Sequence, residues 1–180
     1  MDVDVVIRAQ RGDKDAYAIL AVGIADRFLG VARRILRDFD IAEDATQQAL
    51  LTMWRDLPRL RDPGRFDSWS YRILVHACYN EGRKQRHWAP NLQLLPTAEP
   101  IAEDDLSSVV DRDLIERGFR RLSIDHRAVV VLHFYLDLPI DRVAEILGIP
   151  AGTAHSRLHH AMRALRASLE ADQRPAREVI

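Results

Sequence analysis

The chain has 180 residues, 47% of them hydrophobic, which is the composition of a folded globular protein and excludes a disordered chain. Its 26 basic and 27 acidic side chains leave a formal net charge of −1, and this total argues against a nucleic-acid-binding protein, which usually carries an excess of base. The single cysteine, Cys78, excludes an intramolecular disulfide and a cysteine-based zinc cluster, and it favours a reducing compartment.

The N-terminal segment and the hydropathy pattern indicate a protein of the cytoplasm. Residues 1–17 carry acid where a secretory signal peptide needs base, and they contain no apolar segment of the kind that such a peptide requires. No stretch of the chain approaches the roughly 20 apolar residues of a membrane-spanning helix. We therefore expect a soluble cytoplasmic protein without a membrane partner.

Apolar residues recur at three- and four-residue steps along most of the chain, which predicts an all-α fold. A first helix is predicted around Val5, and a break at residues 12–13 separates it from a long helix that reaches Ile35. Asp40 has the position of the next N-cap, with Glu43 as its capping-box partner. The third helix should carry on one face Ala45, Ala49, Leu50, Met53, Trp54 and Leu57.

Proline and glycine divide the remaining chain into further segments. Residues 58–64 form a predicted loop, and a fourth helix should follow and end near Gly82. Residues 87–105 contain three prolines and no helical period, which is typical of a flexible linker. The chain is thus predicted to comprise two small helical domains, a linker and a tail, with the boundaries 1–86, 87–105, 106–170 and 171–180.

The second domain contains the strongest local motif. After a helix that ends near Leu122 and another capped by Asp125, Pro139 opens a short helix, Gly148 ends it and Pro150 starts the next. Two helices joined by such a tight turn are typical of a helix-turn-helix, whose second helix can enter the DNA major groove. Its outer face would carry Thr153, His155, Ser156, Arg157, His159 and His160. The alternative is a plain helical hairpin with a solvated face.

Charge is distributed unevenly, so the total of −1 is misleading. Residues 55–87 have a net charge of +4 and interleaved aromatic residues, a combination that suits unstacked single-stranded bases. The alternative for two of these aromatic residues, Phe66 and Trp69, is a place in the core. Residues 99–116 have a net charge of −6, and residues 142–166 a net charge of only +3.

Three segments resemble those of one family in the right order and spacing. Residues 41–54 read IAEDATQQALLTMW, residues 62–84 read DPGRFDSWSYRILVHACYNEGRK, and residues 147–166 read LGIPAGTAHSRLHHAMRALR. Together they resemble the extracytoplasmic-function sigma factors of the sigma-70 family. The resemblance implies a non-enzymatic protein without a cofactor or metal. It would bind core RNA polymerase and promoter DNA, and an anti-sigma protein is a further candidate partner.

The resemblance also implies roles for particular residues. Polymerase would be bound by Asp44, Gln47 and Gln48. The −10 promoter element would be bound by the loop and fourth helix, through Arg59, Arg61, Arg65, Phe66, His76, Asn80, Arg83 and Lys84. The −35 element would be read by Thr153, His155, Ser156, Arg157, His159, His160 and Arg163.

The sequence departs from the family pattern at four of its DNA-facing positions. His76 replaces a usual Asn, and His155, His160 and Met162 replace a usual Lys and two usual Arg. Neutral histidines contribute no charge toward phosphates, so we expect −35 binding that is weak or that strengthens as the pH falls toward about 6.5.

Two other functions remain open from the sequence. A helix-turn-helix regulator that acts without polymerase would explain residues 139–166 but not the pattern over residues 41–86. A metal-dependent helical-bundle enzyme would use the histidines, since His155 and His159 stand four residues apart. No third ligand is evident beside them, apart from His160.

Overall fold

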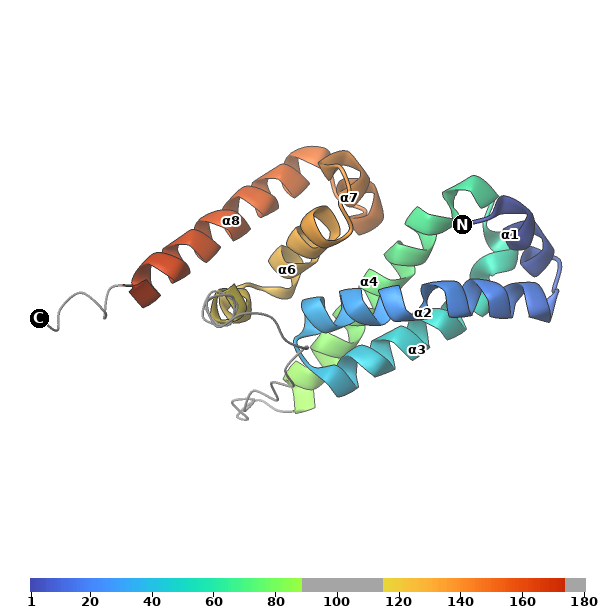
Figure 1. The fold of residues 1–180 in the computed structure, drawn as a ribbon, viewed down its shortest axis with the longest axis horizontal. Coiled ribbons are helices and arrows are strands. Elements are labelled where there is room, and N and C mark those ends of the chain that lie inside the picture. The colour runs from blue at the N-terminus through green and yellow to red at the C-terminus, as the bar shows by residue number, and fades with distance from the viewer. Residues whose placement is uncertain (89–114, 174–180) are drawn as a thin grey trace, which may run out of the picture.

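The structure, a computed structural model, describes residues 1–88 and 115–173 (Figure 1). Every regular element in these ranges is helical, which confirms the predicted all-α fold with two helical units. We call residues 1–88 the N-terminal unit and residues 115–173 the C-terminal unit. Nearly all of the predicted linker, the predicted domain start at Leu106 and the last seven residues of the tail lie outside the described residues.

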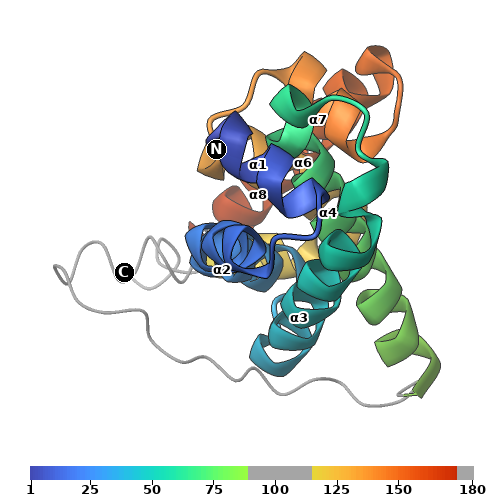
Figure 2. The same cartoon turned by 90° about the vertical axis from the view of Figure 1, so that its right-hand side faces the viewer.

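The N-terminal unit contains four helices. They are α1 (Val3–Gln10), α2 (Lys14–Leu36), α3 (Phe39–Asp56) and α4 (Phe66–Trp88). The long helices α2, α3 and α4 pack against one another, and α1 packs against the start of α2 (Figures 1 and 2). The prediction of Asp40 as an N-cap is wrong: Asp38 has the extended backbone of a cap, and its Oδ1 accepts from the Ile41 amide at 3.0 Å.

The fourth helix also differs from its prediction, because Gly82 does not end it. The helix continues for six residues beyond this glycine, to Trp88. A Cβ at Gly82 would lie 2.9 Å from the Cδ1 atom of Ile124 in the C-terminal unit. The glycine therefore permits a close approach between two helices instead of stopping one.

The C-terminal unit begins, in the described chain, with helical residues 115–121. It continues with α6 (Ile124–Val130), the π-turn η3 (Val131–Tyr135), α7 (Ile140–Leu147) and α8 (Ala151–Gln173). Asp125 is not the cap of α6 as predicted, since the Ser123 hydroxyl accepts from the His126 amide at 3.3 Å. Asp125 instead lies in the first turn of this helix.

The helix-turn-helix forms as predicted. Pro139 is the extended residue before α7, and Gly148 ends that helix with a φ of 65°, which a residue without a Cβ adopts easily. The Ile149 amide donates to the Ala144 carbonyl at 3.1 Å and closes the turn before Pro150. Helix α8 then packs on both α6 and α7.

Residues 128–132, at the end of α6 and the start of the following turn, are all apolar and all buried. One side, including Val130, contacts Ala161 of α8 and forms a small core within the C-terminal unit. The opposite side, including Val129 and Leu132, joins the larger core that α1 to α4 form. The β-branched run at residues 129–131 is thus helical because apolar partners cover it from two directions.

The core of the N-terminal unit should respond to truncation far more than its surface. Phe28 is fully buried, with its ring 5.4 Å from that of Tyr71. We expect Phe28→Ala to lower the free energy of unfolding by about 3–5 kcal/mol, because a cavity replaces the ring. Val22→Ala, on the same helix at 78% exposure, should change it by less than about 0.5 kcal/mol. Denaturant titration measures both, and equal losses would contradict this expectation.

Candidate functional site

Helix α3 presents a polar face to solvent. The side chains of Asp44, Gln47 and Gln48 are exposed at the spacing that places residues on one side of a helix. Leu51 is 64% exposed and extends the same side by one turn. We call these four residues the α3 face. Leu51 was not among the predicted polymerase-binding residues, although its position three residues after Gln48 indicates that it lies on the polar side.

The loop between α3 and α4 is well ordered by local contacts. It consists of two short 3₁₀ turns, η1 (Leu57–Arg59) and η2 (Pro63–Arg65), each of which contains a proline. The Asp62 carboxylate accepts from the Gly64 amide at 2.9 Å. The predicted DNA-binding residues Arg59, Arg61 and Arg65 are all exposed along this loop.

Gln10 of α1 holds this loop in place through two hydrogen bonds. It was not among the residues predicted from the sequence. Its side-chain amide donates to the carbonyl of Leu57 at 3.2 Å and to that of Leu60 at 2.7 Å. One side chain therefore binds the carbonyl of the first residue of η1 and that of the residue that follows η1. No sequence pattern marks Gln10, because its partners lie 47 and 50 residues away.

Phe66 does not join the exposed loop residues. Its side chain is 2% exposed and lies in the core, and its ring centroid is 5.9 Å from that of Trp69. Trp69 is half-buried against the same core. Of the two predicted roles, base stacking and core packing, the structure supports core packing for both residues. Phe66 cannot stack on a base in this conformation.

Helix α4 carries a line of exposed polar side chains. Arg72, His76, Asn80 and Arg83 follow one another at steps of four, four and three residues, so they share one side of the helix. We call these four residues the α4 stripe. Arg72 was not among the predicted DNA-binding residues, although its spacing from His76 could have identified it. Lys84, on the neighbouring side, forms an ion pair with Glu81 at 2.7 Å.

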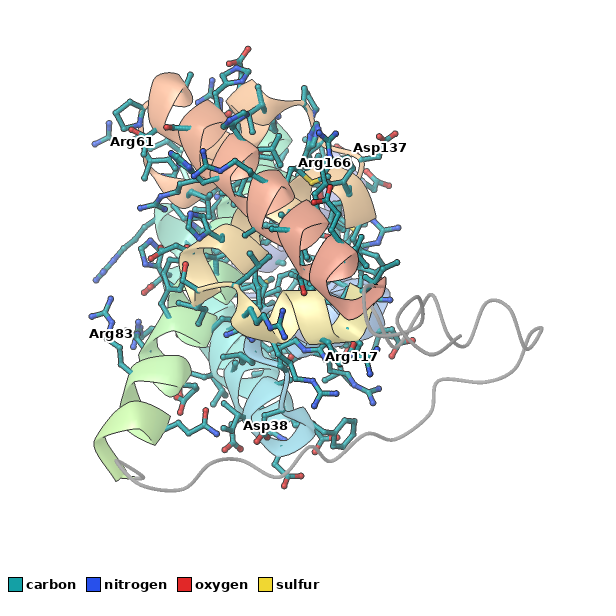
Figure 3. The ribbon with its side chains drawn as sticks, turned by 90° about the vertical axis from the view of Figure 1, so that its left-hand side faces the viewer. Asp38, Arg61, Arg83, Arg117, Asp137 and Arg166 are labelled. Carbon is teal, nitrogen blue, oxygen red and sulfur yellow. The ribbon has the colours of Figure 1, made fainter. Side chains whose placement is uncertain are left out.

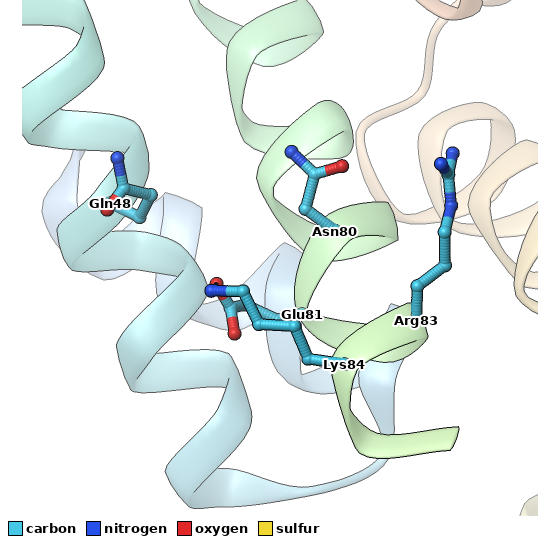
Figure 4. A pocket seen from close by; sticks show the side chains of 5 residues that line it. All are labelled: Gln48, Asn80, Glu81, Arg83 and Lys84. Carbon is cyan, nitrogen blue, oxygen red and sulfur yellow. Dashed lines mark hydrogen bonds and ion pairs between the residues drawn. The ribbon is translucent and has the colours of Figure 1, made fainter. Parts of the chain in front are cut away.

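The α3 face and the α4 stripe meet across an open cleft. Gln48, Asn80, Glu81, Arg83 and Lys84 line this cleft, which has a volume of about 480 Å³ (Figure 4). In the close view, the Glu81 and Lys84 side chains point toward α3, whereas Arg83 lies on the side of α4 away from α3. The fold therefore places the predicted polymerase-binding residues beside the predicted −10-binding residues.

The predicted DNA-binding residues in the first turns of α8 differ in their exposure. His155, Ser156, His159, His160 and Arg163 are exposed, and Thr153 is half-buried. Arg157 is also half-buried, because its guanidinium lies 3.3 Å from the Asp125 carboxylate of α6. Farther along the helix, Arg166 lies well apart from both Arg61 and Arg83 of the N-terminal unit (Figure 3).

Two buried groups are held in their neutral forms. Burial raises the pKa of the Cys78 thiol to about 12, so this cysteine is not a thiolate nucleophile near neutral pH. Burial also raises the pKa of the Tyr79 phenol, and nearby Asp125 adds to the effect. Within the described residues, no group of three His, Cys, Asp or Glu side chains is placed to hold a metal ion.

Comparison with known proteins identifies the family. The model of Sigma-70 region 2 matches residues 24–87, and the model of Sigma-70, region 4 matches residues 112–165. The ECF RNA polymerase sigma factor SigL of Mycobacterium tuberculosis is 32% identical over 142 residues, which cover 77% of this chain and 80% of SigL.

Solved structures agree in fold. CnrH in complex with the cytosolic domain of CnrY matches with a TM-score of 0.70 at 20% identity, over 95% of this chain and 98% of CnrH. The sigma factor RpoE of Bartonella quintana, in complex with the anti-sigma factor NepR, matches with a TM-score of 0.70 at 21% identity, over 87% and 98% of the two chains.

The fold and the two matched regions define a transcription initiation factor of the sigma-70 type. The chain belongs to the ECF RNA polymerase sigma factors. Within the described residues, no helix is both long enough and apolar enough to cross a membrane.

The contacts of Gln10 predict how firmly the loop is held. We expect Gln10→Ala to accelerate hydrogen exchange of the Leu60 and Arg65 amides by about tenfold or more, because each lost hydrogen bond is worth about 0.5–1.5 kcal/mol. Gln10→Glu, which keeps the size but replaces the donor by an acceptor, should act similarly. Val3→Ala, at an exposed position of the same helix, is the control. Unchanged exchange in both Gln10 variants would contradict this role.

Proposed function

We propose that this chain is an alternative sigma factor that binds core RNA polymerase and directs it to promoters. The observation that carries the proposal is the cleft between α3 and α4, where the α3 face adjoins the α4 stripe. A factor that must couple polymerase to an opened promoter strand needs such neighbouring surfaces. The family membership supports the same function.

The proposed polymerase contact is the α3 face. Asp44, Gln47 and Gln48 supply hydrogen-bonding groups, and the exposed Leu51 supplies apolar area at the same place. Catalysis remains with the polymerase, and this chain supplies the choice of promoter.

The proposed contact with the −10 element comprises the loop and the α4 stripe. Arg59, Arg61 and Arg65 project from the ordered 3₁₀ turns, and His76, Asn80, Arg83 and Lys84 continue the surface along α4. Removing a base from the duplex stack costs a few kcal/mol. Basic side chains along the backbone, together with polymerase contacts, would offset this cost.

The proposed contact with the −35 element is the exposed face of α8. His155, Ser156, His159, His160 and Arg163 stand where a recognition helix meets base edges and phosphates. Thr153 and Arg157 would join them. Because Arg163 is the one arginine among these five exposed residues, we expect duplex binding to depend on contacts elsewhere, chiefly those of polymerase.

We also infer a cytoplasmic location and an inhibitory protein partner. CnrH is solved in complex with the cytosolic domain of CnrY, and RpoE is solved in complex with the anti-sigma factor NepR. A partner of this kind would act on this chain by covering the α3 face and the DNA-binding surfaces.

The decisive experiment is transcription in vitro with core polymerase and a library of promoter sequences. The proposal expects initiation that depends on this chain. The active promoters should be enriched in two sequence elements, separated by the distance between a −35 and a −10 element. An ordinary helix-turn-helix regulator would bind duplex DNA but would not associate with core polymerase in a pull-down. Absence of chain-dependent initiation would reject the proposal.

The two surfaces of the N-terminal unit should be separable by mutation. Combined replacement of Asp44, Gln47 and Gln48 by alanine is expected to abolish the pull-down of core polymerase, whereas Asp40→Ala, at an exposed site on the same helix, should not. Asn80→Ala with Arg83→Ala should retain the pull-down and lose promoter opening. Its single-strand affinity should become less salt-dependent, by about 0.7 in slope for each lost phosphate contact.

The histidines of α8 should limit duplex binding. His155→Lys with His160→Arg is expected to steepen the salt dependence of −35 duplex affinity by about 0.9 in slope for each new phosphate contact. Ile19→Lys with Val22→Lys adds the same charge on exposed positions of α2 and serves as the control. A salt dependence of the α8 variant equal to that of the α2 control would contradict this expectation.

A further inference from the structure

Arg157 is the residue of α8 that is best suited to read a guanine. It is the one arginine or lysine among the first ten residues of this helix, 151–160. An arginine presents neighbouring N–H groups in a planar fork, which matches the O6 and N7 atoms of guanine in the major groove. How the guanidinium of Arg157 is oriented therefore bears directly on base recognition.

A carboxylate of another helix holds this guanidinium on one side. The Nη1 atom of Arg157 donates to Oδ1 of Asp125, in the first turn of α6, at 3.3 Å. The other edge of the guanidinium, formed by Nε and Nη2, takes no part in this contact. Because a bidentate contact with guanine needs only one edge, Asp125 and a guanine can bind the same guanidinium at the same time.

Packing within the C-terminal unit fixes both ends of this ion pair. Leu158, the residue after Arg157, packs against the small core that α8 shares with α6. Ser123 caps α6 two residues before Asp125, since its hydroxyl accepts from the His126 amide. The carboxylate and the arginine stem are thus in place before DNA arrives. The long arginine side chain consequently loses less freedom when it binds a base.

The exposure of the pair argues against a mainly stabilising role. The side chain of Arg157 is 29% exposed and that of Asp125 is 49% exposed. A pair this exposed adds little to stability, because water solvates both charges and ordering the side chains costs entropy. A carboxylate beside a DNA-binding helix also repels phosphates. Both points favour orientation of Arg157 as the main effect of Asp125.

We propose that Asp125 is a positioning residue for −35 recognition, which orients the Arg157 guanidinium so that its Nε and Nη2 atoms face a guanine of the −35 element. Without the carboxylate, the guanidinium turns toward phosphates, which carry no sequence information. Loss of Asp125 therefore reduces discrimination between sequences without reducing affinity for DNA in general. The inference rests on the proposed function, because it takes α8 as the helix that reads the −35 element.

The test is transcription in vitro by core polymerase and the full chain on a promoter library. Asp125→Asn and Asp125→Ser remove the charge, whereas Asp125→Glu keeps it. Asp141→Asn is the matched control, because Asp141 is an exposed acid in the first turn of α7. Arg157→Ala identifies the base position that Arg157 reads, and its combination with Asp125→Asn completes a double-mutant cycle. Thermal unfolding, followed by circular dichroism, shows whether each variant is folded.

The proposal expects Arg157→Ala to lower the preference for guanine at one −35 position by about fivefold or more. Asp125→Asn and Asp125→Ser should lower the preference at the same position, while their affinity for a duplex of random sequence stays equal or rises. Asp125→Glu and Asp141→Asn should keep the preference. The double variant should lose no more than Arg157→Ala loses alone, because both changes act through one contact.

Three results would overturn the proposal. They are a guanine preference that survives in the charge-removing variants of Asp125, a further loss in the double variant, and an equal loss in Asp141→Asn. An Arg157→Ala variant that changes no −35 position would also reject it, while initiation by the unmodified chain would leave the proposed function standing. Absence of initiation by the unmodified chain would reject the proposed function itself, and this inference with it.

Discussion

The burial of α6 from two sides is the contact on which the arrangement of both units depends. Val130 faces α8, and Val129 and Leu132 face the N-terminal helices, so neither neighbour alone covers this short helix. Because residues 128–132 are apolar on both of these sides, separating the units would expose one side to solvent or to a new partner. The contact between the units thus rests on a few aliphatic side chains, and Arg72 adds a hydrogen bond of 2.6 Å to the Glu145 carbonyl.

Much of this fold could be predicted from the sequence, because helix periodicity and the Gly148–Pro150 turn are local signals. The errors lie at caps and ends. Asp38 rather than Asp40 caps α3, and Ser123 rather than Asp125 caps α6. In each case two capping residues stand close together, and packing of the following helix decides between them.

The candidate site was predictable in part for a related reason. Exposed polar residues on helix faces, such as Gln47 and Asn80, follow from spacing and from the family resemblance. Phe66 could not be placed with certainty, since an aromatic residue at a helix start serves a core and a base-stacking surface equally well. Arg157 was also ambiguous, because its pairing with Asp125 depends on how α8 crosses α6. Gln10 depends on contacts distant in sequence, which no local pattern reveals.

Gln10 also bears on where one module of this chain ends. The sigma-70 region 2 match begins at residue 24, yet the amide that holds the loop within that region comes from α1. A chimera that transplanted residues 24–87 alone into a related factor would carry the loop without its support. The unit of exchange for promoter specificity is therefore longer than the matched region, and it includes α1.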